Sequence, residues 1–170
     1  DPGFGYYAQI QQLDQLSDKN ILPIPFANAA LWMIPVSVLK KVGGFSPLFY
    51  HYGEDKDFVN RLTYHNYQVS YSPKVFGNHD REYRPMTHQG FLRTEYVYHL
   101  SEYANIRFHW LKAFGYGVLA PMKKALVALL KGRTSLSKDY FHMTFQLLRR
   151  SKEVCFYRKT NRLSNPHYIQ

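Results

Sequence analysis

The sequence predicts an α/β domain that is followed by a basic helical tail, and three observations lead to this expectation. A continuous apolar run at residues 29–34 suits a strand that is buried on both faces. Short helical patterns and a second short strand surround this run before residue 88. After residue 88 the chain changes to long helical patterns and carries most of its basic residues. We therefore predict two parts, residues 1–88 and residues 89–170.

The first elements follow from apolar spacing, prolines and a glycine. Residues 1–20 have an apolar side chain at every third position over a short stretch, which suits a brief helix. Residues 21–26 contain two prolines and are expected to be extended. After the strand at 29–34, Pro35 occupies a first helical position, and the short helix that follows is expected to end at Gly43.

A second helix is predicted from Asp55 to Asn66, because its first turn is acidic and its apolar side chains recur at helical spacing. Residues 69–71 form a short strand that Pro73 closes, and residues 75–76 lead into a segment with His79. The acidic and histidine side chains therefore lie at the ends of elements. Open α/β sheets usually bind their ligands at such positions.

Three helices are predicted in the tail, at residues 90–114, 118–131 and 136–159, with glycine-containing breaks between them. The basic residues near the end of the last helix suit the negative end of its dipole. A solvated helix face that completes the core explains them equally well.

Length and composition limit the classes of protein. The chain has 170 residues, of which 45% are hydrophobic, so one domain with a real core is possible without disulfides. Cys155 is the single cysteine, which favours a reducing compartment and a cytoplasmic location. No run of about eighteen uncharged apolar residues occurs, so no membrane span is predicted.

The net charge of +10 lies entirely in the second half of the chain. Residues 1–80 contain six Lys and Arg against seven Asp and Glu, whereas residues 81–170 contain sixteen against five. Such asymmetry is typical of a surface that meets an anionic lipid, a nucleic acid or a phosphorylated ligand.

Three motifs carry most of the chemical information: Gly-Gly-Phe-Ser-Pro at 43–47, Tyr-Gly-Glu-Asp-Lys-Asp at 52–57 and His-Asp-Arg-Glu at 79–82. In order, spacing and residue type, residues 20–82 resemble the acceptor half of the family 2 glycosyltransferases. The resemblance implies the C-terminal part of a GT-A domain, with a Rossmann-like mixed sheet, and an inverting transfer of sugar from a nucleotide-sugar donor to a glycan or lipid-linked acceptor.

The resemblance also implies roles for individual residues. Asp55 stands in the position of the general base, which takes the proton of the acceptor hydroxyl. Glu54, Gly44, Phe45 and Asp57 are expected to bind the acceptor. On local grounds alone, acidic residues that open a helix serve equally well to satisfy its free N–H groups. Asp55-Lys56-Asp57 also has the Asp-x-Asp form of a metal motif, but we expect that motif upstream, in the nucleotide-binding half.

The resemblance further places His79 where relatives complete the coordination of a divalent ion, Mn or Mg, whose main Asp-x-Asp ligands would lie outside this chain. A histidine with only a structural hydrogen bond explains the sequence about as well. Arg81 is a candidate for phosphate binding or for pairing with Glu82.

The expected protein is thus a bacterial enzyme of cell-envelope polysaccharide synthesis, cytoplasmic and peripheral on the inner membrane face. Its basic tail would meet an anionic membrane surface. Because no donor motif is visible, we expect a fragment of a longer enzyme that transfers no sugar by itself.

Two alternatives belong to other classes. A basic, aromatic-rich module that binds nucleic acid would explain the charge, with tyrosines stacking on bases, but not the three motifs. A helical partner-binding domain without chemistry would leave Glu54, Asp55 and His79 unexplained. The glycosyltransferase interpretation accounts for all three motifs, and under it no nucleic-acid partner is expected.

Overall fold

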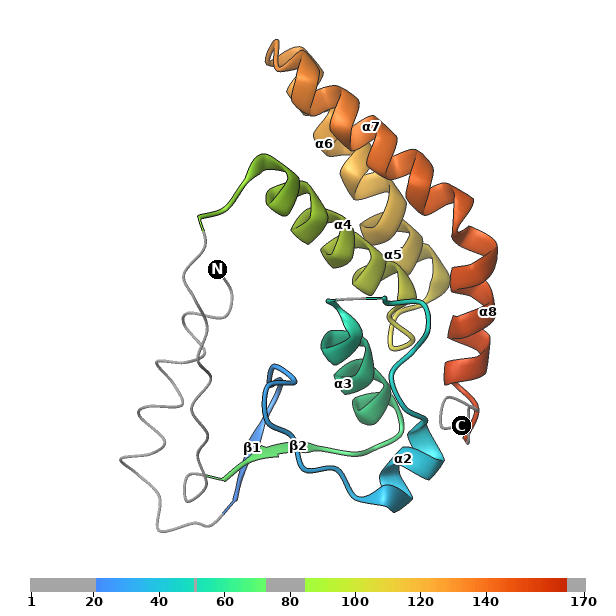
Figure 1. Cartoon of the computed structure of the whole chain (residues 1–170). Coiled ribbons are helices and arrows are strands. Elements are labelled where there is room, and N and C mark those ends of the chain that lie inside the picture. Colours follow the sequence, from blue (N-terminus) through green and yellow to red (C-terminus); the bar gives the residue numbers. More distant parts are fainter. Residues whose placement is uncertain (1–20, 51, 73–84, 165–170) are drawn as a thin grey trace.

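The computed structural model describes residues 21–50, 52–72 and 85–164, and this part of the chain is mostly helical (Figure 1). Its elements, in chain order, are β1 (Leu22–Ile24), α2 (Val36–Val42), α3 (Glu54–Tyr64), β2 (Val69–Tyr71), α4 (His88–Ala104), α5 (Trp110–Phe114), the π-helical turn η1 (Gly115–Leu119), α6 (Ala120–Leu130), α7 (Thr134–Arg149) and α8 (Ser151–Asn161). Figure 1 shows α4 to α8 gathered at one end, the strands and α2 at the other, and α3 between them.

The sheet consists of β1 and β2, which pair antiparallel with Ile24 opposite Val69. The extended segment at 21–26 and the strand at 69–71 are therefore confirmed. The expected Rossmann-like mixed sheet is not found in the described part of the chain, where these two strands form the sheet. The α/β character of the fold is accordingly weak.

The strand that we predicted at residues 29–34 is wrong. This segment is a turn followed by irregular chain, and the side chains of Leu31 and Met33 are 66% and 98% exposed. A strand buried on both faces needs neighbours that bond its backbone groups, whereas β1 and β2 already pair with each other. Trp32 and Ile34 instead pack against the small core formed by α2 and α3.

The two short helices match their prediction closely. Helix α2 follows Pro35 and ends at Gly43, whose φ of 86° is the left-handed conformation that glycine adopts at little cost. Helix α3 ends just before Asn66, another residue with positive φ. The predicted brief helix within residues 1–20 lies outside the described residues, as does the 75–76 segment.

The tail forms more helices than we predicted, because two of the expected helices are interrupted. The first ends at Asn105, whose side chain accepts a hydrogen bond from the backbone N–H of Arg107 and so competes with the helical pattern. The last is divided at Arg150, whose guanidinium reaches the carbonyl of Leu48 and the carboxylate of Glu153. Both interruptions depend on contacts that a periodic pattern does not reveal.

Helices α5 and α6 are joined through η1 into one helical run, Trp110–Leu130, which is 21 residues long. By length and composition alone this run could cross a membrane. The sequence suggested that Pro121 would interrupt the apolar stretch, but it does not break the helical run. It lies in the first turn of α6, where a missing N–H is tolerated. Only 33% of the most apolar stretch of the run is buried in the protein.

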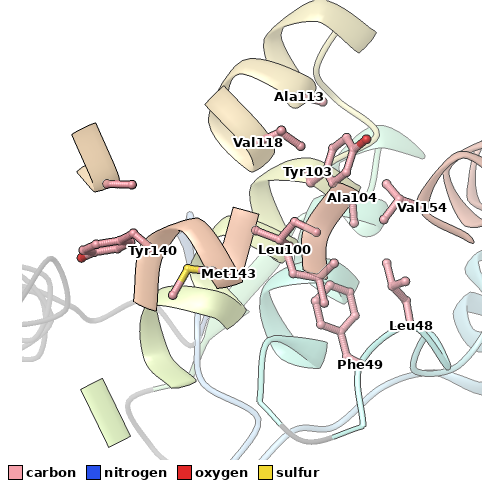
Figure 2. Packing of buried hydrophobic residues seen from close by; sticks show 12 residues of the cluster. Leu48, Phe49, Leu100, Tyr103, Ala104, Ala113, Val118, Tyr140, Met143 and Val154 are labelled. Atoms are coloured by element: carbon pink, nitrogen blue, oxygen red, sulfur yellow. The ribbon is translucent and has the colours of Figure 1, made fainter. Parts of the chain in front are cut away.

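The larger core joins both halves of the chain. Figure 2 shows Leu48 and Phe49, from the segment before α3, beside Leu100 of α4. The same cluster continues through Tyr103 to side chains of α5, η1, α7 and α8. Because this core contains residues from both sides of residue 88, the start of α3 is fixed against the helical tail by apolar packing.

A buried arginine connects α2, α3 and the turn between them. Arg61 is 0% exposed, and its Nε donates to Oδ2 of Asp57 at 2.8 Å. Its two Nη atoms donate to the carbonyls of Val42, at 2.9 Å, and Gly44, at 2.7 Å. One guanidinium therefore satisfies a buried carboxylate and two backbone carbonyls at the end of α2.

Replacing Arg61 by alanine is expected to lower the free energy of unfolding by about 3–5 kcal/mol, because Asp57 would remain buried without its cation. Arg107→Ala is the control, since Arg107 is exposed and its loss should cost less than about 0.5 kcal/mol. Urea denaturation followed by circular dichroism measures both. Equal losses in the two variants would contradict the role assigned to the Arg61 guanidinium.

Two glycines of the π-turn provide a matched test of packing. A Cβ at Gly117 would lie 2.3 Å from Cβ of Tyr103, whereas a Cβ at Gly115 would meet nothing within 4 Å. We expect Gly117→Ala to destabilise the protein by about 1–3 kcal/mol or more, since α4 and η1 would have to separate. Gly115→Ala should be neutral or stabilising by up to about 1 kcal/mol. Thermal unfolding gives the melting temperatures of the two variants. Similar values would contradict the close packing of Gly117 against Tyr103.

Candidate functional site

The candidate site lies where the chain enters α3, and three segments meet there. The carboxylate of Asp55 accepts a hydrogen bond from the backbone N–H of Lys56 at 2.6 Å, and the backbone of Ala29 lies near enough to lower its pKa. The turn at residues 43–46 is held against the same helix through the bond between Arg61 and Gly44. The irregular segment around residues 28–33 and this turn therefore flank the first turn of α3.

The Asp55 carboxylate is only partly exposed. Burial raises its pKa, the N–H of Lys56 acts in the opposite direction, and the neighbouring charge of Glu54 raises it further, so that the pKa lies above its ordinary value. A carboxylate with a raised pKa is a better proton acceptor than one in free solution. The position also lies at the positive end of the α3 dipole, which favours the ionised form.

Three aromatic rings form one side of the site. The ring centroids of Trp32, Phe45 and Phe58 are 5.6 to 6.2 Å apart. Phe58 is buried, whereas Phe45 is 48% exposed and presents part of its ring to solvent. Trp32 lies in the segment that was predicted to be a buried strand, and its partly buried ring packs against the small core and belongs to this cluster.

Two polar atoms in the segments that meet at α3 lack hydrogen-bond partners among the described residues. They are Nε1 of Trp32 and Oε2 of Glu54, and both are buried. Glu54 lies one helical turn before Phe58 on the same face of α3, and the Trp32 ring packs on Phe58. Buried polar atoms normally have partners, so this donor and this acceptor are candidate contacts for a hydroxylated ligand.

Asp57 does not fit the acceptor-binding role that we predicted. Its side chain is 2% exposed and bonded to Arg61. Burial raises the pKa of Asp57 and the Arg61 charge acts against this rise. The Gly44 carbonyl also accepts from Arg61. The carboxylate of Asp57 is thus part of the support beneath the site rather than of its surface.

His79 and Arg81 lie outside the described residues, so the structure does not place them relative to Asp55. Within the described ranges, no group of three His, Cys, Asp or Glu side chains could hold a metal ion. The metal expected at His79 therefore stays a prediction.

Contacts between α3 and α4 were missed by the sequence reasoning. The Lys56 ammonium donates to a carboxylate oxygen of Glu102 and lies 4.8 Å from the centroid of the Tyr98 ring. The Arg93 guanidinium lies 5.2 Å from the ring centroid of Tyr52. No local pattern pairs residues so far apart in the chain, so the sequence carried no usable signal for these contacts.

Gly53 lets the chain turn into α3 against α4. Its φ is +88°, and a Cβ at this position would lie 2.8 Å from Cγ1 of Val97 and 3.0 Å from both Cδ1 of Phe49 and Oγ of Ser101. Tyr52, just before it, also has a positive φ, of 69°. A backbone held in this way beside a candidate catalytic residue keeps the first turn of α3 in place.

Residues 22–89 match a protein-family model that describes the N-terminal domain of galactosyltransferase. The matched range includes all three sequence motifs and the start of α3. No curated protein and no solved structure matched the chain. This part of the chain is therefore similar to a glycosyltransferase domain, of the galactosyltransferase kind, and the expected assignment to family 2 is not supported.

The stability cost of crowding around Gly53 can be measured separately from the cost of its left-handed backbone conformation. Gly132 also has a positive φ, of +70°, but a Cβ there would meet nothing within 4 Å. We expect Gly132→Ala to cost about 1–2 kcal/mol, from the left-handed conformation alone. Gly53→Ala should cost about 1–3 kcal/mol more, because α3 and α4 must move apart. Chemical denaturation measures the free energy of unfolding of both variants. Equal losses would mean that the contact between Gly53 and α4 is loose.

Proposed function

We propose that the start of α3 is the acceptor side of a sugar-transfer site, with Asp55 as the general base. The observation that carries the proposal is this partly buried carboxylate with a raised pKa in the first turn of α3. The same helix carries Glu54, whose buried Oε2 has no partner among the described residues, and Phe58, on which the Trp32 and Phe45 rings pack. The similarity of residues 22–89 to a galactosyltransferase domain supports the same reaction class.

The proposed reaction is one displacement at the anomeric carbon of a nucleotide sugar. A carboxylate oxygen of Asp55 takes the proton of the acceptor hydroxyl as that oxygen bonds to the anomeric carbon. The bond from this carbon to the phosphate oxygen breaks, and the electron pair leaves with the nucleoside diphosphate. Because attack and departure occur on opposite faces, the configuration is inverted.

The residues around Asp55 would orient the acceptor. Oε2 of Glu54 can accept a hydrogen bond from one sugar hydroxyl, and Nε1 of Trp32 can donate one to another. The exposed face of Phe45 offers an apolar surface to the C–H groups of the sugar ring. Glycans and lipid-linked glycans are the acceptor classes that this arrangement fits.

The donor side of the reaction is proposed from the sequence alone. We propose a nucleotide-sugar donor whose diphosphate is neutralised by Mn or Mg, with His79 as one ligand and Arg81 near a phosphate. When bound, such an ion would stabilise the negative charge that develops on the leaving group. We also propose a reducing compartment for this reaction, since Cys155 is free and exposed.

In the full-length protein, Asp55→Asn is expected to lower kcat/KM for sugar transfer by about 10²- to 10⁴-fold, because an amide cannot take the acceptor proton. The wild-type rate should fall as the pH drops through the pKa of Asp55, which must be ionised to act. Since burial raises this pKa, that fall should begin above the pH at which a free aspartate protonates.

Asp139→Asn is the matched control, since Asp139 lies on α7 and pairs with His88 at the surface. Its kcat/KM and its pH profile should remain those of the wild type. The pH profile distinguishes a base from a structural carboxylate, because loss of folding would lower the rate at every pH. If Asp55→Asn retains both the activity and the acidic fall of the wild type, Asp55 is not the base.

A further inference from the structure

The helical run Trp110–Leu130 presents many of its large apolar side chains to solvent. Seven of its apolar side chains are between 39% and 87% exposed, and we call them the apolar strip: Leu111, Tyr116, Leu119, Leu126, Val127, Leu129 and Leu130. Its buried positions are mostly small, namely Ala113, Gly117, Ala125 and Ala128, together with Val118 and Pro121. An ordinary surface helix turns its large apolar side chains inward, so the exposed set is unusual.

Every charged residue in and just after this run is basic. Residues 110–133 contain no Asp or Glu, and their cations are Lys112, Lys123, Lys124, Lys131 and Arg133. Lys124 is bonded to Glu95, on the protein side. Lys112, Lys123, Lys131 and Arg133 are exposed, so they are available to a partner together with the apolar strip.

We propose that the apolar strip docks on an anionic lipid surface. Apolar side chains interleaved with lysines, on a helix without acidic residues, are typical of helices that lie in the membrane interface. The leucines would enter the boundary of the acyl chains, and the long lysine side chains would reach the anionic headgroups. This docking does not depend on the proposed sugar transfer.

The run lies on the membrane rather than across it, because its other face is packed against protein. The carbonyl of Ala125 accepts a hydrogen bond from Oγ of Ser137 on α7, at 2.9 Å. Gly117 packs against Tyr103 of α4 so closely that no Cβ would fit. A membrane-spanning arrangement would have to remove both neighbours from the helix.

A nucleic-acid partner is disfavoured by the same observations. Phosphate backbones attract the lysines but offer nothing to a strip of aliphatic side chains. The two interactions also differ in their response to salt and to apolar substitution. Binding to lipid should need both the leucines and the lysines, whereas binding to nucleic acid should need only the cations.

Co-sedimentation of the 170-residue chain with lipid vesicles tests the proposal. We expect the wild type to bind vesicles of phosphatidylcholine with 30% phosphatidylglycerol at least tenfold more tightly than vesicles of phosphatidylcholine alone. The triple variant Leu119→Gln, Leu126→Gln and Leu130→Gln should lose at least tenfold of this binding. Its side chains are 48% to 87% exposed, so we expect the variant to keep the helical circular dichroism spectrum of the wild type. The double variant Lys123→Gln and Lys131→Gln should lose the preference for the anionic lipid.

A matched triple variant controls for general loss of apolar surface. Met86→Gln, Phe156→Gln and Leu163→Gln replace side chains of comparable exposure that lie outside the strip. This control should bind vesicles as the wild type does. Equal binding by the strip variant and the wild type would overturn the proposal, as would equal losses in the two triple variants.

The single cysteine allows a second measurement. In the double variant Cys155→Ser and Leu126→Cys, a polarity-sensitive fluorophore attached at position 126 reports on the apolar strip. In the wild type, the same fluorophore attached to Cys155 reports on α8. We expect a blue shift on addition of anionic vesicles for the label at 126 only. Retention of the protein after carbonate extraction would contradict the interfacial position. If the triple variant of the strip binds vesicles normally but no longer forms a concentration-dependent dimer, the strip binds a second copy of the chain instead, and the proposal is overturned.

Discussion

Arg61 holds α3 against the chain that precedes it, and its ion pair with Asp57 on the same helix fixes the guanidinium in place. Both side chains are removed from water, so neither can be changed alone without leaving an uncompensated charge in the interior. The two remaining bonds of the guanidinium go to backbone carbonyls at the end of α2. The turn that carries Phe45 is therefore held by an electrostatic constraint, and the candidate site is built on top of it.

The second constraint is the contact between α3 and α4. The larger core, the Lys56–Glu102 pair and the absence of space around Gly53 all fix the first turn of α3 against the helical part. The division at residue 88 remains a prediction, but the two parts are not independent in their packing. The first turn of α3, which carries Asp55, therefore packs directly on the helical tail.

Local chemistry in the sequence was sufficient to predict the short helices. Gly43 and the acidic residues after Gly53 have strong positional preferences, and the structure places helix ends there. The exposure of Leu31 and Met33 could not be predicted, because an apolar run does not show whether a neighbouring strand exists to pair with it. The burial of Asp57 depends on Arg61, one helical turn later, and the Lys56 contact depends on a helix far along the chain. The sequence suggested the residues around Asp55, but not which of them support the site and which face the ligand.

The π-turn η1 sets the rotational phase of α6. A turn of this kind holds one more residue than an α-helical turn, and one residue of an α-helix corresponds to a rotation of about 100°. A single-residue deletion within Gly115–Leu119 would thus rotate leucines of α6 toward α7 and turn the buried alanines of α6 to the outside. The length of η1 therefore determines which side chains of α6 are exposed, and so it determines the chemical character of the exposed face as much as the side chains themselves do.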